Sequence, residues 1–353
     1  MNIFVSGISH KTAPIDIREK FYLNETERKL LLSTLRSDPA VVEAIVLSTC
    51  NRTEIYANVL SEHASAILLK ALFKIKNIPF TSSLEKYFYE LYEEDAIRHF
   101  LRVCAGLESI VFGERQVLGQ VKSAVELSRM RGMLGKYFNV LSGLAIRTGK
   151  KAQNESQISY GGVSISWAAV TMAKRMLGSF RNKSFLIIGA GKMGHLAAGH
   201  LKNRGAGHIY VMNRSKEKAE LLAEKFGGTP VSFWDIKEIL SEVDVCFCSA
   251  GAPHYLIEKD LLEKVMSTRQ ERKLLCVDIS IPRNIEPSVS SLNNVSLITI
   301  DDLGDVVAQN MEKRYSALSQ VENIIQGKIE QFKSKVSRIQ ACEQSGSYVS
   351  VIV

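Results

Sequence analysis

The sequence lacks the features that place a protein in a membrane or in an oxidising compartment. No uninterrupted apolar stretch approaches the roughly 20 residues that cross a bilayer. The first residues carry neither a basic leader nor a small-residue cleavage site, so we expect no secretory signal. The six cysteines are scattered, and no CxxC pair offers a zinc site. We therefore expect a cytoplasmic protein without a membrane contact or a metal, in which a reduced cysteine can be reactive.

Acidic residues are moderately fewer than basic residues. The chain has 45 Lys and Arg against 37 Asp and Glu, which gives a formal net charge of +8. Such a surplus favours a polyanionic partner such as a nucleic acid, but a generally basic surface without that role explains it equally well. The length of 353 residues exceeds what one hydrophobic core usually holds and predicts two or three domains.

The pattern of apolar residues predicts a multidomain α/β protein. Residues 1–155 alternate short strands with helices before a helical stretch from Glu93 to Lys151, which is typical of an α+β domain. Residues 156–300 alternate strands and helices as in a parallel, doubly wound sheet, and Leu274–Ile279 is expected to be the last strand. Residues 301–353 contain a long polar helix, about Val306–Ile339, that connects domains or pairs with another helix.

A glycine-rich loop follows the strand expected at Ser184–Ile188 and opens the next helix. It matches G-x-G-x-x-G in the strand–turn–helix context that indicates dinucleotide binding. In such a loop the first glycine permits the turn, the second admits the pyrophosphate, and the third lets helix and strand pack closely. The alternative is a coincidental glycine turn. The loop residues are Gly189, Ala190, Gly191, Lys192, Met193 and Gly194.

The end of the following strand indicates which dinucleotide is bound. NAD sites usually place Asp or Glu there, whereas this chain has Asn213, Arg214 and Ser215. A carboxylate would repel a 2′-phosphate, but Arg214 can pair with it, and its neighbours can donate hydrogen bonds. We therefore expect NADPH as the cofactor. The alternative is that Arg214 only caps a loop in solvent.

A cysteine lies in the polar turn from Ser48 to Glu54, between two apolar strands. Arg52 follows Cys50 closely, and a cation favours the thiolate, so we expect a lowered pKa for this thiol. Thiolate is the attacking form in acyl transfer. The alternative is a small residue of the core, which is what most lone cysteines are.

Together these motifs resemble the glutamyl-tRNA reductase family over about residues 1–335. The resemblance rests on motifs that occur in the family's order along the chain. They are Gly7–Pro14, the Cys50 turn, Gly106–Ser109, Gly113–Lys122, the glycine loop, Asn213-Arg214, Asp278–Arg283 and Asp301-Asp302-Leu303.

The resemblance implies a two-step, NADPH-dependent reduction of glutamyl-tRNA(Glu). Cys50 is implied as the nucleophile that takes glutamate from the tRNA as a thioester. Hydride from NADPH then releases glutamate-1-semialdehyde, the committed precursor of 5-aminolevulinate and the porphyrins. It further implies a catalytic domain at 1–155, a Rossmann-type NADP-binding domain at 156–300, and a long spinal helix with a shortened dimerisation region at 301–353.

The resemblance also implies which residues form the substrate pocket. Arg52 is suited to the γ-carboxylate of the substrate and Glu114 to its α-ammonium group. His99 is implied as catalytic, as a proton donor or an orienting group, while a structural role is the alternative; His10 is a weaker candidate. The alternative for the pocket residues is helix capping. The implied pocket residues are Thr49, Cys50, Asn51, Arg52, Ser109, Glu114, Arg115, Gln116 and Gln120.

The sequence departs from the family at three places. Arg115 stands where the family commonly has proline, and Lys192 where it commonly has glutamate. The family usually continues into a further helical domain that dimerises, whereas this chain stops soon after the long helix. We therefore expect a homodimer, if one forms, to use a shortened interface. A glutamate-1-semialdehyde aminomutase is the partner that the family suggests for the product.

Two other functions compete with this interpretation. An NADP-dependent dehydrogenase of the shikimate type explains the second half of the chain but leaves Cys50 without a role. A non-catalytic protein that binds tRNA and NADPH would form no acyl adduct.

Overall fold

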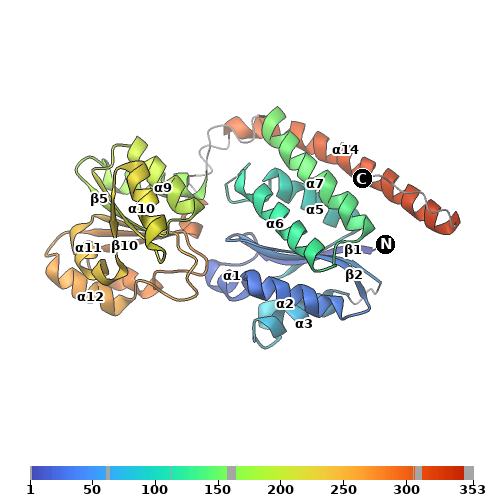
Figure 1. Cartoon of the computed structure of the whole chain (residues 1–353), viewed down its shortest axis with the longest axis horizontal. Helices are drawn as coiled ribbons and strands as arrows, with labels where there is room; N and C mark the ends of the chain where they lie inside the picture. Colours follow the sequence, from blue (N-terminus) through green and yellow to red (C-terminus); the bar gives the residue numbers. More distant parts are fainter. Residues whose placement is uncertain are drawn as a thin grey trace. The chain divides into compact units, whose positions relative to one another are not determined.

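The computed structural model describes residues 2–60, 64–111, 113–156, 164–304, 306 and 312–345. The chain divides into two compact units (Figure 1). Unit 1 comprises residues 1–162 together with 311–353, and unit 2 comprises residues 163–310. The chain therefore leaves unit 1, builds unit 2, and returns to unit 1 with its last helix.

Unit 1 is built on a four-stranded antiparallel sheet in the order β2-β3-β1-β4. Ser9 of β1 lies opposite Arg52 of β3, and Ser48 of β2 lies opposite Thr53 of β3. The turn from β2 to β3 therefore lies at the same end of the sheet as the end of β1. The strands are β1 (Asn2–Ser9), β2 (Val41–Ser48), β3 (Arg52–Val59) and β4 (Tyr89–Tyr92).

Helices cover both faces of this sheet (Figure 1). Successive side chains of a strand point to opposite faces, so Ile3 and Val5 enter one core, while Phe4 and Ile8 enter the other. The helices α2 and α3 lie over the second core, and α5, α6, α7 and α14 over the first. The helices are α1 (Ile15–Phe21), α2 (Glu25–Arg36), α3 (Ala64–Ile75), α4 (Ser82–Glu85), α5 (Glu93–Ala105), α6 (Gln116–Met130), α7 (Lys136–Glu155) and α14 (Glu312–Ser345).

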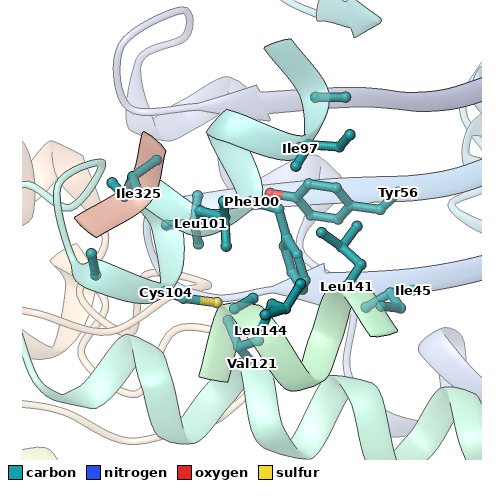
Figure 2. Close-up of a cluster of buried hydrophobic side chains, with 14 of the residues drawn as sticks. Ile45, Tyr56, Ile97, Phe100, Leu101, Cys104, Val121, Leu141, Leu144 and Ile325 are labelled. Atoms are coloured by element: carbon teal, nitrogen blue, oxygen red, sulfur yellow. The ribbon is translucent and has the colours of Figure 1, made fainter. Parts of the chain in front are cut away.

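The first core joins the sheet to the long C-terminal helix. Figure 2 shows Phe100 of α5 among side chains from the sheet and from α7, and its ring lies 4.6 Å from that of Tyr56. Ile325 of α14 belongs to the same cluster. The α14 stripe recurs every three or four residues, which confirms the helical spacing in the sequence. Its members are Val321, Ile325, Ile329, Phe332 and Val336, all of them buried.

Unit 2 is a six-stranded, entirely parallel sheet in the order β10-β9-β8-β5-β6-β7. This is the Rossmann order, which confirms the predicted fold class. The strands are β5 (Ser184–Ile188), β6 (His208–Met212), β7 (Thr229–Val231), β8 (Val245–Cys248), β9 (Leu274–Asp278) and β10 (Val295–Thr299). The helices are α8 (Ile165–Leu177), α9 (Lys192–Asn203), α10 (Lys216–Phe226), α11 (Ile236–Glu242) and α12 (Lys259–Thr268), with 3₁₀ turns at Phe233–Asp235, Pro287–Ser291 and Ile300–Leu303.

One prediction about this sheet is wrong. The strand at Leu274–Ile279 does not close the series, because β10 pairs with it in parallel and forms the edge of the sheet. An edge strand is only half buried, and exposed Ser296 interrupts its apolar run, so the strand signal is weak. Within the described residues, no helix is both long enough and apolar enough to span a bilayer.

Candidate active site

The Cys50 turn connects β2 and β3 and is fixed by its own backbone. The Thr49 N–H donates to the Arg52 carbonyl at 2.8 Å, and the Asn51 N–H donates to the Thr49 hydroxyl at 3.1 Å. The buried guanidinium of Arg18, in α1, donates to the Cys50 carbonyl at 2.9 Å. Cys50 itself is partly exposed. A cation and two turn contacts therefore present this residue at the end of the sheet.

The Cys50 thiol differs from the prediction made for it. Burial of the sulfur raises its pKa to about 12, and the nearby carboxylate of Glu114 acts in the same direction. The cations of Arg18 and Arg52 oppose this effect but do not outweigh it. The expected lowered pKa is therefore wrong for this conformation, because the sequence shows the neighbouring arginine but not the burial or Glu114. The resting thiol is neutral at pH 7.

Arg52 is almost fully buried and is held by two acceptors. Its Nη1 lies 2.6 Å from Oε1 of Glu54, and its Nη2 donates to the backbone carbonyl of Glu108. These contacts use two of its five N–H donors and fix the plane of the guanidinium. Arg52 is thus a pre-oriented cation next to the Cys50 turn.

Glu54 is the centre of a buried polar cluster that the sequence did not predict. Its carboxylate accepts from Arg52, from the hydroxyls of Tyr56 and Tyr89, and lies 3.0 Å from Nε2 of His99. Burial alone would raise the pKa of Glu54, but Arg52 and His99 hold it well below its usual range. An ionised carboxylate only accepts hydrogen bonds, so Nε2 of His99 carries a proton. His99 is therefore oriented by Glu54, and its role as a proton donor stays a prediction.

The loop between α5 and α6, together with the start of α6, carries further predicted residues, and its Glu108 and Glu114 interact with residues of the Cys50 turn. Gly106 ends α5 in the left-handed conformation, with φ +79°. Glu108 follows and binds Arg52 through its carbonyl, while Glu114 is buried and its charge reaches Cys50. Ser109, Gln116 and Gln120 are partly exposed, and Arg115 is exposed at the start of α6.

Three buried polar atoms of the predicted site residues, with His10 included, have no hydrogen-bond partner among the described residues. They are Oδ1 of Asn51, Nε2 of Gln116 and Nδ1 of His10. The backbone N–H of His10 donates to the carbonyl of Asn51 at 2.9 Å, which places His10 beside the turn. Burial, together with Arg52 and Arg18, lowers the pKa of His10 to about 3, so this side chain is neutral. Unpaired buried donors and acceptors are costly, and a polar ligand would satisfy them.

The glycine loop of unit 2 lies at the carboxyl end of β5. Gly189 has φ +107°, and a Cβ there would lie 2.8 Å from the Ala250 nitrogen. A Cβ on Gly194 would lie 1.9 Å from the Gly189 carbonyl oxygen, which excludes any side chain. A Cβ on Gly191 would meet no atom within 4 Å, so this glycine faces open space at the start of α9. The three glycines therefore have the geometry of a dinucleotide site.

The residues that we predict to select the cofactor differ in their contacts. Asn213 accepts a hydrogen bond from the Ala190 N–H at 3.1 Å and donates to the Ser215 carbonyl at 3.0 Å, so it braces the glycine loop. Ser215 caps α10 and donates to Glu217 at 2.7 Å. Arg214 and Lys192 are exposed. The two cations, rather than Asn213 and Ser215, are thus available to an added phosphate.

Comparison with known proteins shows to which family the chain belongs. Residues 6–156 match the family model described as Glutamyl-tRNAGlu reductase, N-terminal domain, and residues 171–306 match Shikimate / quinate 5-dehydrogenase. The glutamyl-tRNA reductase of Priestia megaterium is 40% identical over 339 residues, which are 95% of this chain and 75% of that protein. The chain belongs to the glutamyl-tRNA reductase family.

Other members of the family agree. The glutamyl-tRNA reductase of Solibacter usitatus is 37% identical over 95% of this chain and 80% of its own length. The solved structure of glutamyl-tRNA reductase from Methanopyrus kandleri superposes with a TM-score of 0.51 at 32% identity, over 96% of this chain and 81% of that one. The dehydrogenase match covers only the nucleotide-binding half, so it does not favour a shikimate-type dehydrogenase for the whole chain.

Four of the other cysteines of this family member are buried packing residues. Cys104 is fully buried in the first core of unit 1 (Figure 2), and Cys246, Cys248 and Cys276 are buried in unit 2. Burial raises the pKa of Cys276 to about 12. Cys50 thus remains the predicted nucleophile.

Proposed function

We propose that this chain reduces the glutamate of glutamyl-tRNA(Glu) to glutamate-1-semialdehyde, with release of the tRNA, as the first committed step of tetrapyrrole synthesis. The observation that carries the proposal is the Cys50 turn beside the oriented Arg52 and Glu114, in a chain 40% identical to a glutamyl-tRNA reductase over 95% of its length. The competing function, that of a shikimate-type dehydrogenase, would leave the Cys50 turn without a role.

In the first step the Cys50 sulfur attacks the ester carbonyl that joins glutamate to the tRNA. A carbon–sulfur bond forms, the ester carbon–oxygen bond breaks, and the thiol proton leaves with the ribose oxygen of the tRNA. Because the resting thiol is neutral, its proton has to depart as the attack proceeds. The negative charge of Glu114 disfavours the Cys50 thiolate. An α-ammonium group bound to Glu114 would neutralise this charge and thereby favour the attack.

Arg52 is suited to the γ-carboxylate of the glutamate. The Glu54 carboxylate and the Glu108 carbonyl fix its guanidinium before any substrate arrives, which lowers the entropic cost of binding. The unpartnered atoms of Asn51 and Gln116 supply an acceptor and a donor for the rest of the amino acid. We assign Thr49, Ser109, Arg115 and Gln120 to the same pocket, and His99 to proton transfer or orientation.

The second step uses NADPH, which supplies a hydride to the acyl carbon. The carbon–sulfur bond breaks, the aldehyde leaves, and a proton returns to the Cys50 sulfur. The open face of Gly191, at the N-terminus of α9, suits the pyrophosphate, and exposed Arg214 suits a 2′-phosphate.

Because we assign the 2′-phosphate to Arg214, Arg214→Gln should weaken NADPH binding by roughly ten-fold or more and leave NADH binding unchanged. A fluorescence titration with each dinucleotide measures both effects.

The proposal extends to the compartment and the partners. We extend it to a cytoplasmic location and to transfer of the aldehyde to a glutamate-1-semialdehyde aminomutase, which the family suggests; a homodimer, if one forms, would use a shortened interface. Sedimentation velocity tests the dimer, and co-purification with the aminomutase tests the transfer.

The direct test is incubation with charged tRNA and NADPH, followed by an assay for the aldehyde. Wild-type protein should form it, whereas Cys50→Ser should not. Cys342→Ser, a change of the other partly exposed cysteine among the described residues, should retain full activity and is the matched control. Equal aldehyde formation by wild type and Cys50→Ser would contradict the thioester route.

A further inference from the structure

Glu108 connects the substrate arginine to a second set of charges. Its backbone carbonyl accepts a hydrogen bond from Arg52. Its carboxylate pairs with Lys11 through one oxygen and with Nε of Arg102, at 2.6 Å, through the other. The carboxylate is largely buried, with 10% of the side chain exposed, so its two cations are needed to offset desolvation. The position of the Glu108 carbonyl therefore depends on what holds the Glu108 side chain.

Arg102 has a second partner on the long helix. Its Nη1 pairs with Glu322 of α14, and both side chains are less than one-third exposed. Glu322, Arg102, Glu108 and Lys11 thus form a chain of alternating charges that runs from α14 to the end of the sheet. All four residues belong to unit 1, and the chain ends at the residue that holds Arg52.

Other polar contacts hold α14 to α5 without reaching the pocket. Arg98 donates to Gln326 at 2.7 Å, and Lys333 pairs with Glu94 at 2.5 Å. Neither pair touches Glu108 in the part of the chain that the structure describes. These contacts are therefore natural controls, because they share the anchoring role and lack the connection to Arg52.

We propose that Arg102 is a positioning residue that couples α14 to the substrate-binding guanidinium of Arg52 through Glu108. The loop that carries Glu108 begins at Gly106, whose left-handed backbone ends α5. Backbone hydrogen bonds of Leu107 and Gly113 hold the base of this loop, and the ion pairs of the Glu108 side chain add to them. Losing Arg102 leaves Lys11 as the remaining ion-pair partner of the Glu108 carboxylate, and losing Glu322 removes the contact that holds Arg102 to α14, so in both cases the Glu108 carbonyl holds the guanidinium of Arg52 less firmly. The inference rests on the proposed function, since it takes Arg52 as the group that recognises the γ-carboxylate.

The test measures recognition of that carboxylate rather than activity alone. The probes are tRNA(Glu) charged with glutamate and the same tRNA charged chemically with glutamine, which lacks the negative charge. The ratio of single-turnover rates of acyl transfer to Cys50 is compared in wild type, Arg102→Gln, Arg102→Lys and Glu322→Gln. Lys333→Gln is the control, because it removes an anchor of α14 that does not reach Glu108.

Wild type should prefer glutamate by about 10²-fold or more, because a buried arginine rejects an uncharged analogue. Arg102→Gln should reduce this preference about ten-fold, Glu322→Gln should reduce it in the same direction, and Arg102→Lys should recover part of it. The double variant Arg102→Gln/Glu322→Gln should be no worse than Arg102→Gln. Lys333→Gln should change the melting temperature at most and leave the preference unchanged.

Unchanged preference in Arg102→Gln and Glu322→Gln, with wild type selective, would overturn the inference. If Arg102→Gln does not fold, Glu322→Gln decides the question, because it removes the contact at the more peripheral partner. A wild-type protein that transfers no glutamate, or shows no preference, would instead refute the proposed function or the role of Arg52. The two failures are therefore distinguishable.

Discussion

At the scale of single residues, Glu54 and Glu114 are two buried carboxylates with opposite relations to their surroundings. Glu54 is surrounded by donors, and Arg52 and His99 keep its pKa low despite burial. Burial of the Cys50 sulfur raises the pKa of that thiol, and the negative charge of Glu114 adds to this effect. One carboxylate therefore stabilises a fixed cation, while the other acts with burial to keep the Cys50 thiol protonated.

Glu114→Gln should lower the pKa of Cys50, because the variant removes a negative charge that disfavours the thiolate. Alkylation by iodoacetamide at pH 8 should then be several-fold faster than in wild type, without any substrate present. Glu126→Gln, a change of an exposed carboxylate on α6, is the control. Alkylation as slow as in wild type would contradict the assigned cause.

Glu54→Gln should destabilise unit 1 strongly. The change leaves the buried guanidinium of Arg52 without its counter-charge, which typically costs roughly 3 to 5 kcal/mol. Urea unfolding measures this loss. The same experiment on Glu126→Gln, in a surface ion pair, should show a change of at most about 1 kcal/mol.

The pH dependence of stability should also differ between these proteins. The pKa of Glu54 is lowered in the folded state from an ordinary value of 4.5, so its stabilising contribution is present above that value and lost as the pH falls below it. Wild type should therefore lose stability more steeply than Glu54→Gln below about pH 4.5. Parallel curves for the two proteins would show that folding does not shift the pKa of Glu54 and would contradict the assigned lowering.

At the scale of elements, two glycines of the loop between β5 and α9 differ in the space around them, so substitutions there should separate effects on folding from effects on binding. Gly194 has no space for a side chain because the Gly189 carbonyl lies against it, whereas Gly191 faces open space. Both positions fit the same motif, but packing within the unit excludes a side chain at Gly194 and not at Gly191, where we expect the ligand to need the space.

Gly191→Ala and Gly194→Ala should therefore give different results. Gly191→Ala adds a methyl group in open space, with an extended backbone that alanine accepts, so the melting temperature should stay unchanged while NADPH binding weakens about ten-fold or more. Gly194→Ala forces a backbone clash and should lower both stability and binding. Differential scanning fluorimetry and NADPH titration measure the two effects. Wild-type NADPH affinity in Gly191→Ala would place the dinucleotide elsewhere.

The elements that could be predicted are those whose signal is local. The strands β5, β6, β8 and β9 of unit 2, its helices α8, α9 and α10, the glycine loop and the stripe on α14 follow from patterns within about 15 residues, whereas the edge strand β10 does not. The Glu54 cluster was missed because its contacts join residues far apart, such as Glu54 with His99 and Arg52 with Glu108, which are 45 and 56 positions apart. The sequence does carry one signal of this cluster. Arg52 and Glu54 are two positions apart in a strand, so their opposite charges lie on the same face of the sheet, and both are buried.

At the scale of the whole molecule, the two halves of the proposed reaction reside in different units. Unit 1 carries the Cys50 turn and its charged cluster, and unit 2 carries the glycine loop. Acyl transfer to Cys50 should therefore need only the side chains of unit 1 and should proceed without a dinucleotide. Reduction of the acyl group should need both.

The most direct measurement is mass spectrometry of the intact protein after incubation with glutamyl-tRNA(Glu) in the absence of NADPH. We predict that a glutamyl adduct forms on Cys50, that hydroxylamine removes it, and that added NADPH discharges it as the aldehyde. Cys50→Ser should not form this thioester adduct. A protein that makes the aldehyde from charged tRNA and NADPH while no adduct ever forms on Cys50 would contradict the account.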